Sequence, residues 1–261
     1  MIVEDDDFPD LPAGRGTVVQ NLERAVVEDH LLRREDGGWA VKGASWDGPH
    51  PWIVGKVPWP LPCRKLRQFL FTCAYDRARV PWACRNCHKV RIQPRTMREL
   101  VAVQEWIGTL SLPFKCGVEL GRRGCPGAYG ATLYIDGAEQ AEAVRRGLVE
   151  GAAARPRIGS DLPVWVRRGC AVFEAHCGPI DQYEFDPLQA EIEPALLERV
   201  TVLPPPRGRP PRAATYLYWL HTAHRVGDRT CRDFTGGQRM WPPSPADEME
   251  DLTPARSPFG R

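Results

Sequence analysis

The sequence predicts an α+β fold, and three observations support this class. Between residues 86 and 168, short apolar runs typical of strands alternate with stretches whose apolar residues recur at helical spacing. Proline, glycine or capping residues separate these runs. The chain has 261 residues, of which 43% are hydrophobic and 26% are charged, and such a chain can bury a sizeable core.

The chain before this core predicts one helix and an irregular cover. Residues 17–33 predict a helix, because Val18, Leu22 and Val26 recur on one side. Residues 38–62 contain four tryptophans among prolines and glycines, which indicates short strands and turns.

The core itself begins with a strand and a capped helix. Residues 88–92 predict a strand that Pro94 ends. Thr96 and Glu99 form a capping-box pattern, since a Thr hydroxyl and a Glu side chain three residues later satisfy backbone N–H groups at a helix start. We expect this helix to continue to about residue 111.

The second half of the core contains three more strands and a helix. The expected elements, in order, are a strand at 114–120, a glycine-rich turn at 121–130, a strand at 131–135, a helix capped by Asp136 and Glu139 that runs to residue 149, and a strand at 162–166.

The order strand, helix, strand, strand, helix, strand is that of a ferredoxin-like βαββαβ core at about residues 86–168. In such a core the first and last strands are antiparallel neighbours. The start of the first strand therefore lies beside the end of the last one.

The pattern divides the chain into four parts. Residues 1–62 form the N-terminal helix and the Trp/Pro-rich cover, and residues 63–178 form a cysteine-rich ferredoxin-like core. Residues 179–241 form an extension with helices at 187–199 and 213–226 around a proline-rich spacer. We expect a disordered tail at 242–261.

The nine cysteines require an explanation other than disulfides. The first thirty residues lack the pattern of a secretory signal, and no run of eighteen apolar residues predicts a membrane span. We therefore expect a cytoplasmic protein whose thiols stay reduced. Reduced cysteines at this number favour a metal site.

The metal ligands are predicted from spacing and topology together. Cys84 and Cys87 form the one close Cys-x-x-Cys pair, and they immediately precede the first core strand. Cys170 immediately follows the last core strand, so it should lie beside them. Cys73 can loop back to the same place as a fourth ligand. Cys116 is the first substitute and Cys177 the second.

Four thiolates suit either zinc or a [4Fe–4S] cluster. Zinc ribbons usually show two close cysteine pairs, whereas this chain shows only one, which favours iron. The surplus of cysteines points the same way.

Other interpretations of these residues stay open. Cys84 to His88 also matches the attachment motif of c-type haem, although that chemistry takes place outside the cytoplasm. A thioredoxin-like pair would need a helix after Cys87, whereas an extended segment is predicted. His221 and His224 with Cys231 form a further metal candidate, and any of the cysteines can simply be a buried small side chain.

A basic segment surrounds the predicted metal site. Residues 64–98 contain ten Lys or Arg and one acidic residue, Asp76. Basic residues interleaved with aromatic rings are typical of nucleic-acid binding. The residues expected to contact nucleic acid or another polyanion are Arg77, Arg79, Trp82, Arg85, Lys89, Arg91 and Arg95.

Three classes of function follow from these features. The first is a metal-containing module that binds nucleic acid or another polyanion. The second is an iron–sulfur redox enzyme subunit or electron carrier, and the third is a metal-stabilised adaptor for a protein partner. No P-loop, dinucleotide-binding glycine pattern or Ser-His-Asp set is present to identify an enzyme.

Overall fold

The computed structural model describes residues 11–42, 51–121, 125–204 and 211–244. The expected turn at 121–130 and the proline-rich spacer are therefore described only in part. Residues 245–261, most of the predicted tail, lie outside the described residues.

A five-stranded antiparallel sheet forms the centre of the molecule, and the α+β class is confirmed. Its strands stand in the order β5-β7-β8-β6-β9. They are β5 (Trp52–Val54), β6 (Cys87–Ile92), β7 (Phe114–Val118), β8 (Tyr129–Asp136) and β9 (Val164–Arg168).

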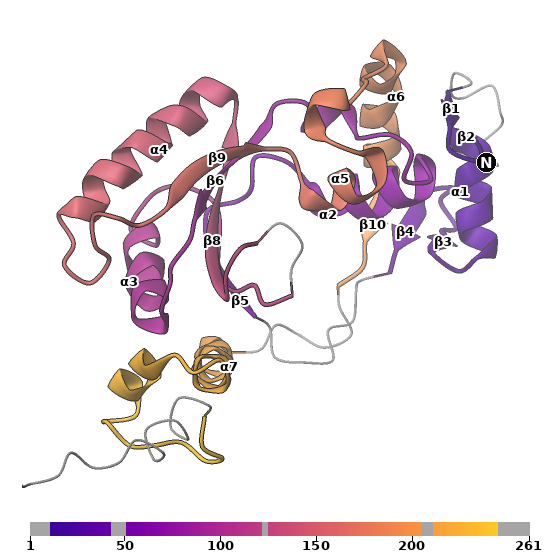
Figure 1. Ribbon diagram of the computed structural model, residues 1–261. Helices are drawn as coiled ribbons and strands as arrows, with labels where there is room; N and C mark the ends of the chain where they lie inside the picture. Colours follow the sequence, from indigo (N-terminus) through magenta and orange to yellow (C-terminus); the bar gives the residue numbers. More distant parts are fainter. Residues whose placement is uncertain (1–10, 43–50, 122–124, 205–210, 245–261) are drawn as a thin grey trace, which may run out of the picture.

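The chain enters and leaves the core at neighbouring strand ends. Strands β6 and β9 pair antiparallel, with His88 opposite Arg168, so Cys87 at the start of β6 lies close to the end of β9. Helices α3 (Met97–Ile107) and α4 (Ala138–Ala153) cover one face of this sheet (Figure 1). That face holds the larger hydrophobic core.

A second hydrophobic core lies in the N-terminal part of the structure, away from α3 and α4 (Figure 1). There, β4 pairs antiparallel with β3 and parallel with β10, and β1 pairs with β2. The elements are β1 (Pro12–Ala13), β2 (Gly16–Thr17), α1 (Val18–Val27), β3 (Leu31–Arg33), β4 (Trp39–Val41) and β10 (Val200–Val202).

Short helical segments join these two parts. They are α2 (Cys63–Lys65), the π-helix η2 (Leu66–Ala74), η3 (Trp82–Cys84), α5 (Ala171–Cys177), η4 (Ile180–Gln182) and α6 (Pro187–Glu198). Residues of η2, η3, α5 and α6 belong to the N-terminal core, and the π-helix η2 was not predicted from the sequence.

The C-terminal helix α7 (Arg212–Arg225) packs against β5, β7 and α3, and η5 (Arg229–Phe234) follows it. Trp219 fixes its position, because the fully buried indole donates a hydrogen bond to the carbonyl of Pro51 at 2.8 Å. The expected helix at 213–226 is therefore confirmed as part of the main core.

The N-terminal helix is shorter than predicted. It spans Val18–Val27, capped by Thr17, and does not continue to residue 33. Asp29 adopts a left-handed backbone conformation (φ 59°), which ends the helix, and Leu31–Arg33 form a strand instead.

The helix caps of the core are only partly as predicted. The Thr96 hydroxyl accepts from the Glu99 N–H, but the Glu99 carboxylate accepts from Arg95 and not from Thr96. The cap of α4 was predicted wrongly, because Gly137 with φ +91° occupies the N-cap and makes no side-chain bond. The last strand begins at Val164, two residues later than expected.

No helix among the described residues is long and apolar enough to cross a bilayer.

Candidate four-cysteine site and cationic cavity

Five cysteines line one cavity. Four of them, Cys63, Cys84, Cys87 and Cys170, come from three distant chain segments, and the fifth, Cys125, accepts a hydrogen bond of 3.4 Å from the Arg91 guanidinium. Cys63 begins α2, Cys84 ends η3, Cys87 begins β6, and Cys170 caps the start of α5. Burial is the largest cause of the raised pKa values of Cys63 and Cys84, and nearby cysteines add to it: Cys87 and Cys170 for Cys63, Cys87 and Cys63 for Cys84. No disulfide involves any of the nine cysteines.

Burial is the main influence on these thiols. It raises the pKa of Cys63 to about 11, with the neighbouring cysteines adding to the shift and Lys89 opposing it. Burial also raises the pKa of Cys84, to a greater extent. Bringing thiolates together here requires a cation to offset their desolvation and mutual repulsion.

The loop that carries Cys84 is held by a buried carboxylate. Glu193 on α6 is 3% exposed and accepts hydrogen bonds from the backbone N–H groups of Trp82 (2.6 Å) and Ala83 (3.3 Å). It also accepts the Tyr75 hydroxyl at 2.9 Å. The loop is therefore anchored one residue before its first cysteine.

The far end of the same loop is fixed to the segment before Cys170. The Gly169 N–H donates to the Cys87 carbonyl at 2.8 Å, and the Arg168 guanidinium donates twice to the Arg85 carbonyl at 3.0 and 3.1 Å. Lys89 donates to the Gly169 carbonyl and lies 3.6 Å from the Cys87 sulfur. Backbone contacts thus keep Cys87 and Cys170 close together.

The structure brings together three of the cysteines expected as ligands, and Cys63 stands where Cys73 was expected. Cys73 lies in the N-terminal core, where its thiol donates to the Gln68 carbonyl and its charged neighbours are Arg77 and Glu28. Cys116 is fully buried under α3 in the main core. Cys177 donates to the carbonyl of Arg77.

Cys63 was not predicted, because its partners lie far away in sequence. Its position is set by α2 and the π-helix η2, whose geometry has no simple sequence pattern. The nearest signal is Pro62, since proline is common at helix starts and α2 begins at Cys63.

The cavity has a volume of about 870 Å³ and lies on the sheet face that α3 and α4 leave uncovered. Side chains alternate along a strand, so Cys87, Lys89 and Arg91 on β6 all point to this face, while Val90 and Ile92 point into the main core. Aromatic rings also line it, including Trp52 and a stacked pair, Trp59 and Tyr134, with centroids 4.1 Å apart.

A buried ion pair lies deep in the cavity. Arg91 is 6% exposed and Glu119 is 2% exposed, and their side chains are bonded by two hydrogen bonds, one of 3.1 Å. Burial acts to raise the pKa of Glu119, but Arg91, Cys125 and Lys115 together lower it to about 2. Gly130 permits this arrangement, because a Cβ there would overlap the Glu119 carboxylate.

The residues expected to contact nucleic acid do not share one surface. Lys89 and Arg91 line the cavity, whereas Arg95 pairs with Asp161 at the opposite end of the strand. Trp82 and Arg85 stack on each other, with the guanidinium carbon 4.5 Å from the ring centroid.

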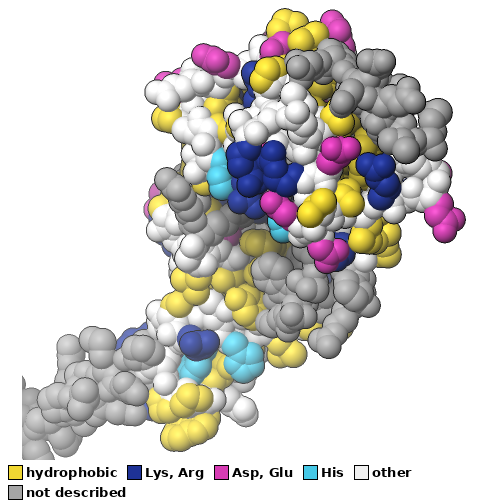
Figure 2. Space-filling model, turned by 90° about the vertical axis from the view of Figure 1, so that its right-hand side faces the viewer, with side chains coloured by type: hydrophobic (Ala, Val, Ile, Leu, Met, Phe, Trp, Pro, Cys, Tyr) yellow, Lys and Arg dark blue, Asp and Glu magenta, His cyan; other side chains and the backbone are white. Residues whose placement is uncertain are grey.

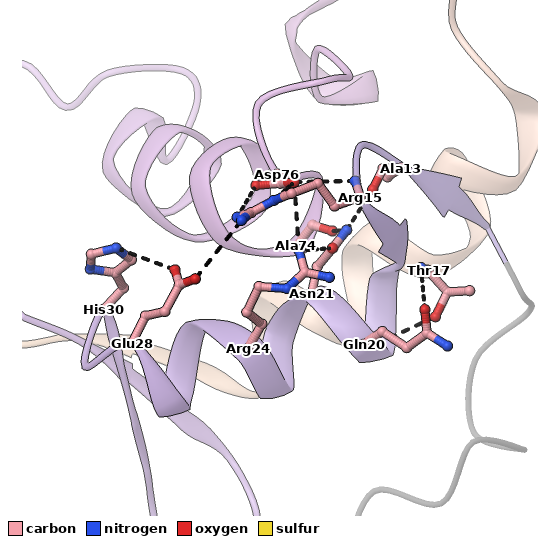
Figure 3. Close-up of polar contacts among 10 residues, drawn as sticks. All are labelled: Ala13, Arg15, Thr17, Gln20, Asn21, Arg24, Glu28, His30, Ala74 and Asp76. Carbon is pink, nitrogen blue, oxygen red and sulfur yellow. Dashed lines mark hydrogen bonds and ion pairs between the residues drawn. The ribbon is translucent and has the colours of Figure 1, made fainter.

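The other two predicted contacts, Arg77 and Arg79, lie at the N-terminal part. Next to them Asp76 accepts three hydrogen bonds from Arg15, and Asn21 ties α1 to the carbonyl of Ala74 (Figure 3). Arg79 donates to the Pro12 carbonyl. On this face, Lys and Arg side chains stand beside Asp and Glu side chains (Figure 2).

The remaining candidates are placed as follows. Cys87 begins a strand and not a helix, unlike the pair of a thioredoxin-like site. His224 is buried and its Nε2 bonds the carbonyl of Pro242 at 2.6 Å, while His221 is exposed.

Among the described residues, no group of three or more His, Cys, Asp or Glu side chains is arranged to hold a metal ion as it stands. Comparisons with protein-family models, curated proteins and solved structures give no match to the chain.

Proposed function

We propose that the protein is an iron–sulfur protein whose cluster is held by Cys63, Cys84, Cys87 and Cys170. The observation that carries this proposal is the convergence of these four thiols on one cavity from three segments of the chain. Four Cys ligands with irregular spacing are the usual set for a [4Fe–4S] cluster.

The cysteine spacing favours a cluster over zinc, because zinc ribbons usually have two close Cys-x-x-Cys pairs and this chain has one. A tetrahedral zinc site with Zn–S bonds of about 2.3 Å holds its sulfurs about 3.8 Å apart. Within the ranges that the structure describes, no group of three or more His, Cys, Asp or Glu side chains is arranged to hold a single metal ion. The ligands of a cluster lie farther apart, because each thiolate binds a different iron.

We also propose that the unit from β6 to β9 is a ferredoxin-like core. The order β7-β8-β6-β9, antiparallel throughout, with α3 and α4 on one face, supports it. Such a core explains why cysteines 83 residues apart meet, since the chain enters at β6 and leaves at β9.

The site favours an iron–sulfur redox enzyme over a polyanion-binding module. The proposed cluster faces a cavity whose volume lies in the range of small-molecule sites, about 300–1,000 Å³. The basic residues expected to bind nucleic acid are instead distributed over separate surfaces, and several are paired with carboxylates or stacked.

Metal analysis of protein produced and purified without oxygen tests the proposal. We expect a brown protein with absorbance at about 400 nm and about four irons and four sulfides per chain. Serine at position 63, 84, 87 or 170 should reduce the iron content by more than half. Cys177→Ser is the matched control, because Cys177 is half-buried like Cys63 and Cys170 but bonds a backbone carbonyl.

Two results would contradict the proposal. One zinc per chain without sulfide would replace the cluster by a mononuclear site. Equal iron loss in Cys73→Ser and Cys63→Ser would show that Cys63, Cys84, Cys87 and Cys170 are not the specific ligands of the cluster.

A further inference from the structure

The cavity beside the four cysteines carries more positive charge than its own carboxylates balance. Lys115 and Arg91 share Glu119, and Arg167 pairs with Glu174. Lys56, Arg64, Arg67 and Lys89 also line the cavity, and none of these four forms an ion pair within the described part of the chain.

The proposed cluster would not neutralise the positive charge of these four cations. Four thiolates with a [4Fe–4S] core carry about two negative charges in total. The four cations without ion pairs exceed this, and without a cluster the excess is larger still. A cavity with such an excess attracts an anionic ligand.

The cations are distributed from the rim to the floor. Arg64, Arg67 and Lys56 are exposed, whereas Lys89 is half-buried on the sheet. Lys89 stands opposite Arg167 on β9 and opposite Tyr134 on β8, so charge and an aromatic ring lie side by side. Arg64 and Arg67 form no ion pair with another described residue, and an exposed guanidinium of this kind is suited to bidentate contacts with phosphate.

The size and the walls limit what can enter. At about 870 Å³ the cavity accommodates a molecule of drug or nucleotide size. Trp52, which has the Lys115 Nζ 4.6 Å from its ring centroid, and the Trp59–Tyr134 stack add aromatic rings to the walls next to the cations. A flat ring can pack on such surfaces while a charged group faces the lysines and arginines.

We propose that the cavity binds a phosphorylated small molecule that carries an aromatic ring, of the size of a mononucleotide. Its phosphate groups lie among Lys56, Arg64, Arg67 and Lys89, and its ring packs against Trp52 or Trp59. This inference names the ligand class of the redox site proposed above, but the charge excess on which it rests exists without the cluster.

Binding of ADP to the full chain tests this inference, followed by calorimetry and tryptophan fluorescence at low salt. We expect binding that weakens as salt rises, because phosphate contacts are electrostatic. Adenosine, which lacks phosphate, and pyrophosphate, which lacks a ring, should each bind at least tenfold more weakly than ADP.

The double variant Lys56→Gln/Arg67→Gln should weaken ADP binding about tenfold. Both side chains are exposed, and neither belongs to the four cysteines proposed to hold the cluster, so folding and iron content should not change. Arg146→Gln is the matched control: Arg146 is exposed on α4, and α4 covers the other face of the sheet.

The outcomes separate the ligand from the cluster. ADP binding in a Cys84→Ser/Cys87→Ser variant without iron would support the cavity and count only against the cluster. Absence of ADP binding to iron-replete protein at millimolar concentration would overturn the ligand proposal alone. Equal affinities of the double variant and Arg146→Gln would also overturn it, as would a single-stranded oligonucleotide that binds more tightly than ADP.

Discussion

The carboxylate of Glu193 on α6 accepts a hydrogen bond of 2.6 Å from the backbone N–H of Trp82, two residues before Cys84. The two residues are 111 positions apart in sequence. A buried acceptor of this kind fixes the main chain, because a backbone N–H without a partner in the interior is costly. Glu193 therefore acts on the cysteine loop through its backbone and does not contact the thiols.

Replacement of Glu193 tests this positioning role. Glu193→Ala leaves the N–H groups of Trp82 and Ala83 and the hydroxyl of Tyr75 without their acceptor. We expect a loss of about 3 kcal/mol in the free energy of unfolding and lower iron content. Glu193→Gln keeps an acceptor oxygen and should restore most of the iron. Urea unfolding and iron analysis measure both effects.

Glu191→Ala provides the control, since Glu191 is exposed on the same helix. Its stability and iron content should match those of the original protein. If Glu193→Ala lost stability but kept all its iron, Glu193 would support the fold and not the cysteine loop.

Gly169 also helps to position the cysteine site, and its substitution should lower both stability and iron content. It has a left-handed backbone (φ +69°), and a Cβ there would lie 2.8 Å from Ile180. We expect Gly169→Ala to cost about 2 kcal/mol and to reduce iron content, because the Gly169 N–H bonds the Cys87 carbonyl.

Gly236→Ala separates backbone strain from this crowding. Gly236 has a similar conformation (φ +64°), but a Cβ there meets nothing within 4 Å. Its cost should be about 1 kcal/mol, without effect on iron. Equal losses in the two variants would show that backbone strain alone explains the effect at Gly169.

Local patterns were sufficient to predict most of the core. The strand at β6, the Thr96 cap and the apolar spacing of α3 are properties of neighbouring residues, and the structure has all three. The end of α1 could not be predicted, because it depends on the left-handed conformation of Asp29. The π-helix η2 depends on packing within the N-terminal core.

The site was predictable only where topology determined it. Cys84, Cys87 and Cys170 lie at the joined ends of two paired strands, so the strand order was enough to place them together. Cys73 and Cys63 precede the core, and nothing in the sequence near them shows which one turns towards the strands. Contacts of the π-helix decide this, with Cys73 turned into the N-terminal core.

The Arg91–Glu119 pair predicts a specific loss of stability in acid. The folded state lowers the pKa of Glu119 from 4.5 to about 2, despite the opposing effect of burial. A lowered carboxyl pKa contributes stability that is complete above the unfolded value and is lost as the pH falls through the folded value. The free energy of unfolding should therefore fall by about 3 kcal/mol between about pH 5 and pH 2 from this group.

Glu119→Gln identifies the source of this loss. At neutral pH the variant should be less stable by about 3 kcal/mol, because Arg91 stays buried without its counter-charge. The difference from the original protein should shrink below about pH 4. Glu142→Gln, which breaks an exposed pair with Arg145, should leave the free energy of unfolding nearly unchanged, because solvent screens that pair. A difference at Glu119 that stays constant with pH would exclude the ion pair as its cause.

The close approach of β5 and β7 predicts a large loss of stability when Gly117 is replaced. Gly117 on β7 lies against the backbone before β5, and a Cβ there would overlap the carbonyl oxygen of Pro51. The same oxygen accepts the indole N–H of Trp219, so β5 cannot move away without breaking that bond as well. Gly117→Ala should therefore lower the free energy of unfolding by at least about 3 kcal/mol and displace Trp52 from the cavity. A weaker response of tryptophan fluorescence to ADP would report that displacement.

Gly147 provides the contrasting case. It is exposed on α4, a Cβ there meets nothing within 4 Å, and alanine is the better helix former. Gly147→Ala should raise the free energy of unfolding by about 0.5–1 kcal/mol and leave the cavity unchanged. If both substitutions were neutral, β5 would not be held against β7 as the structure describes, and the cavity would lose the strand that forms its outer wall.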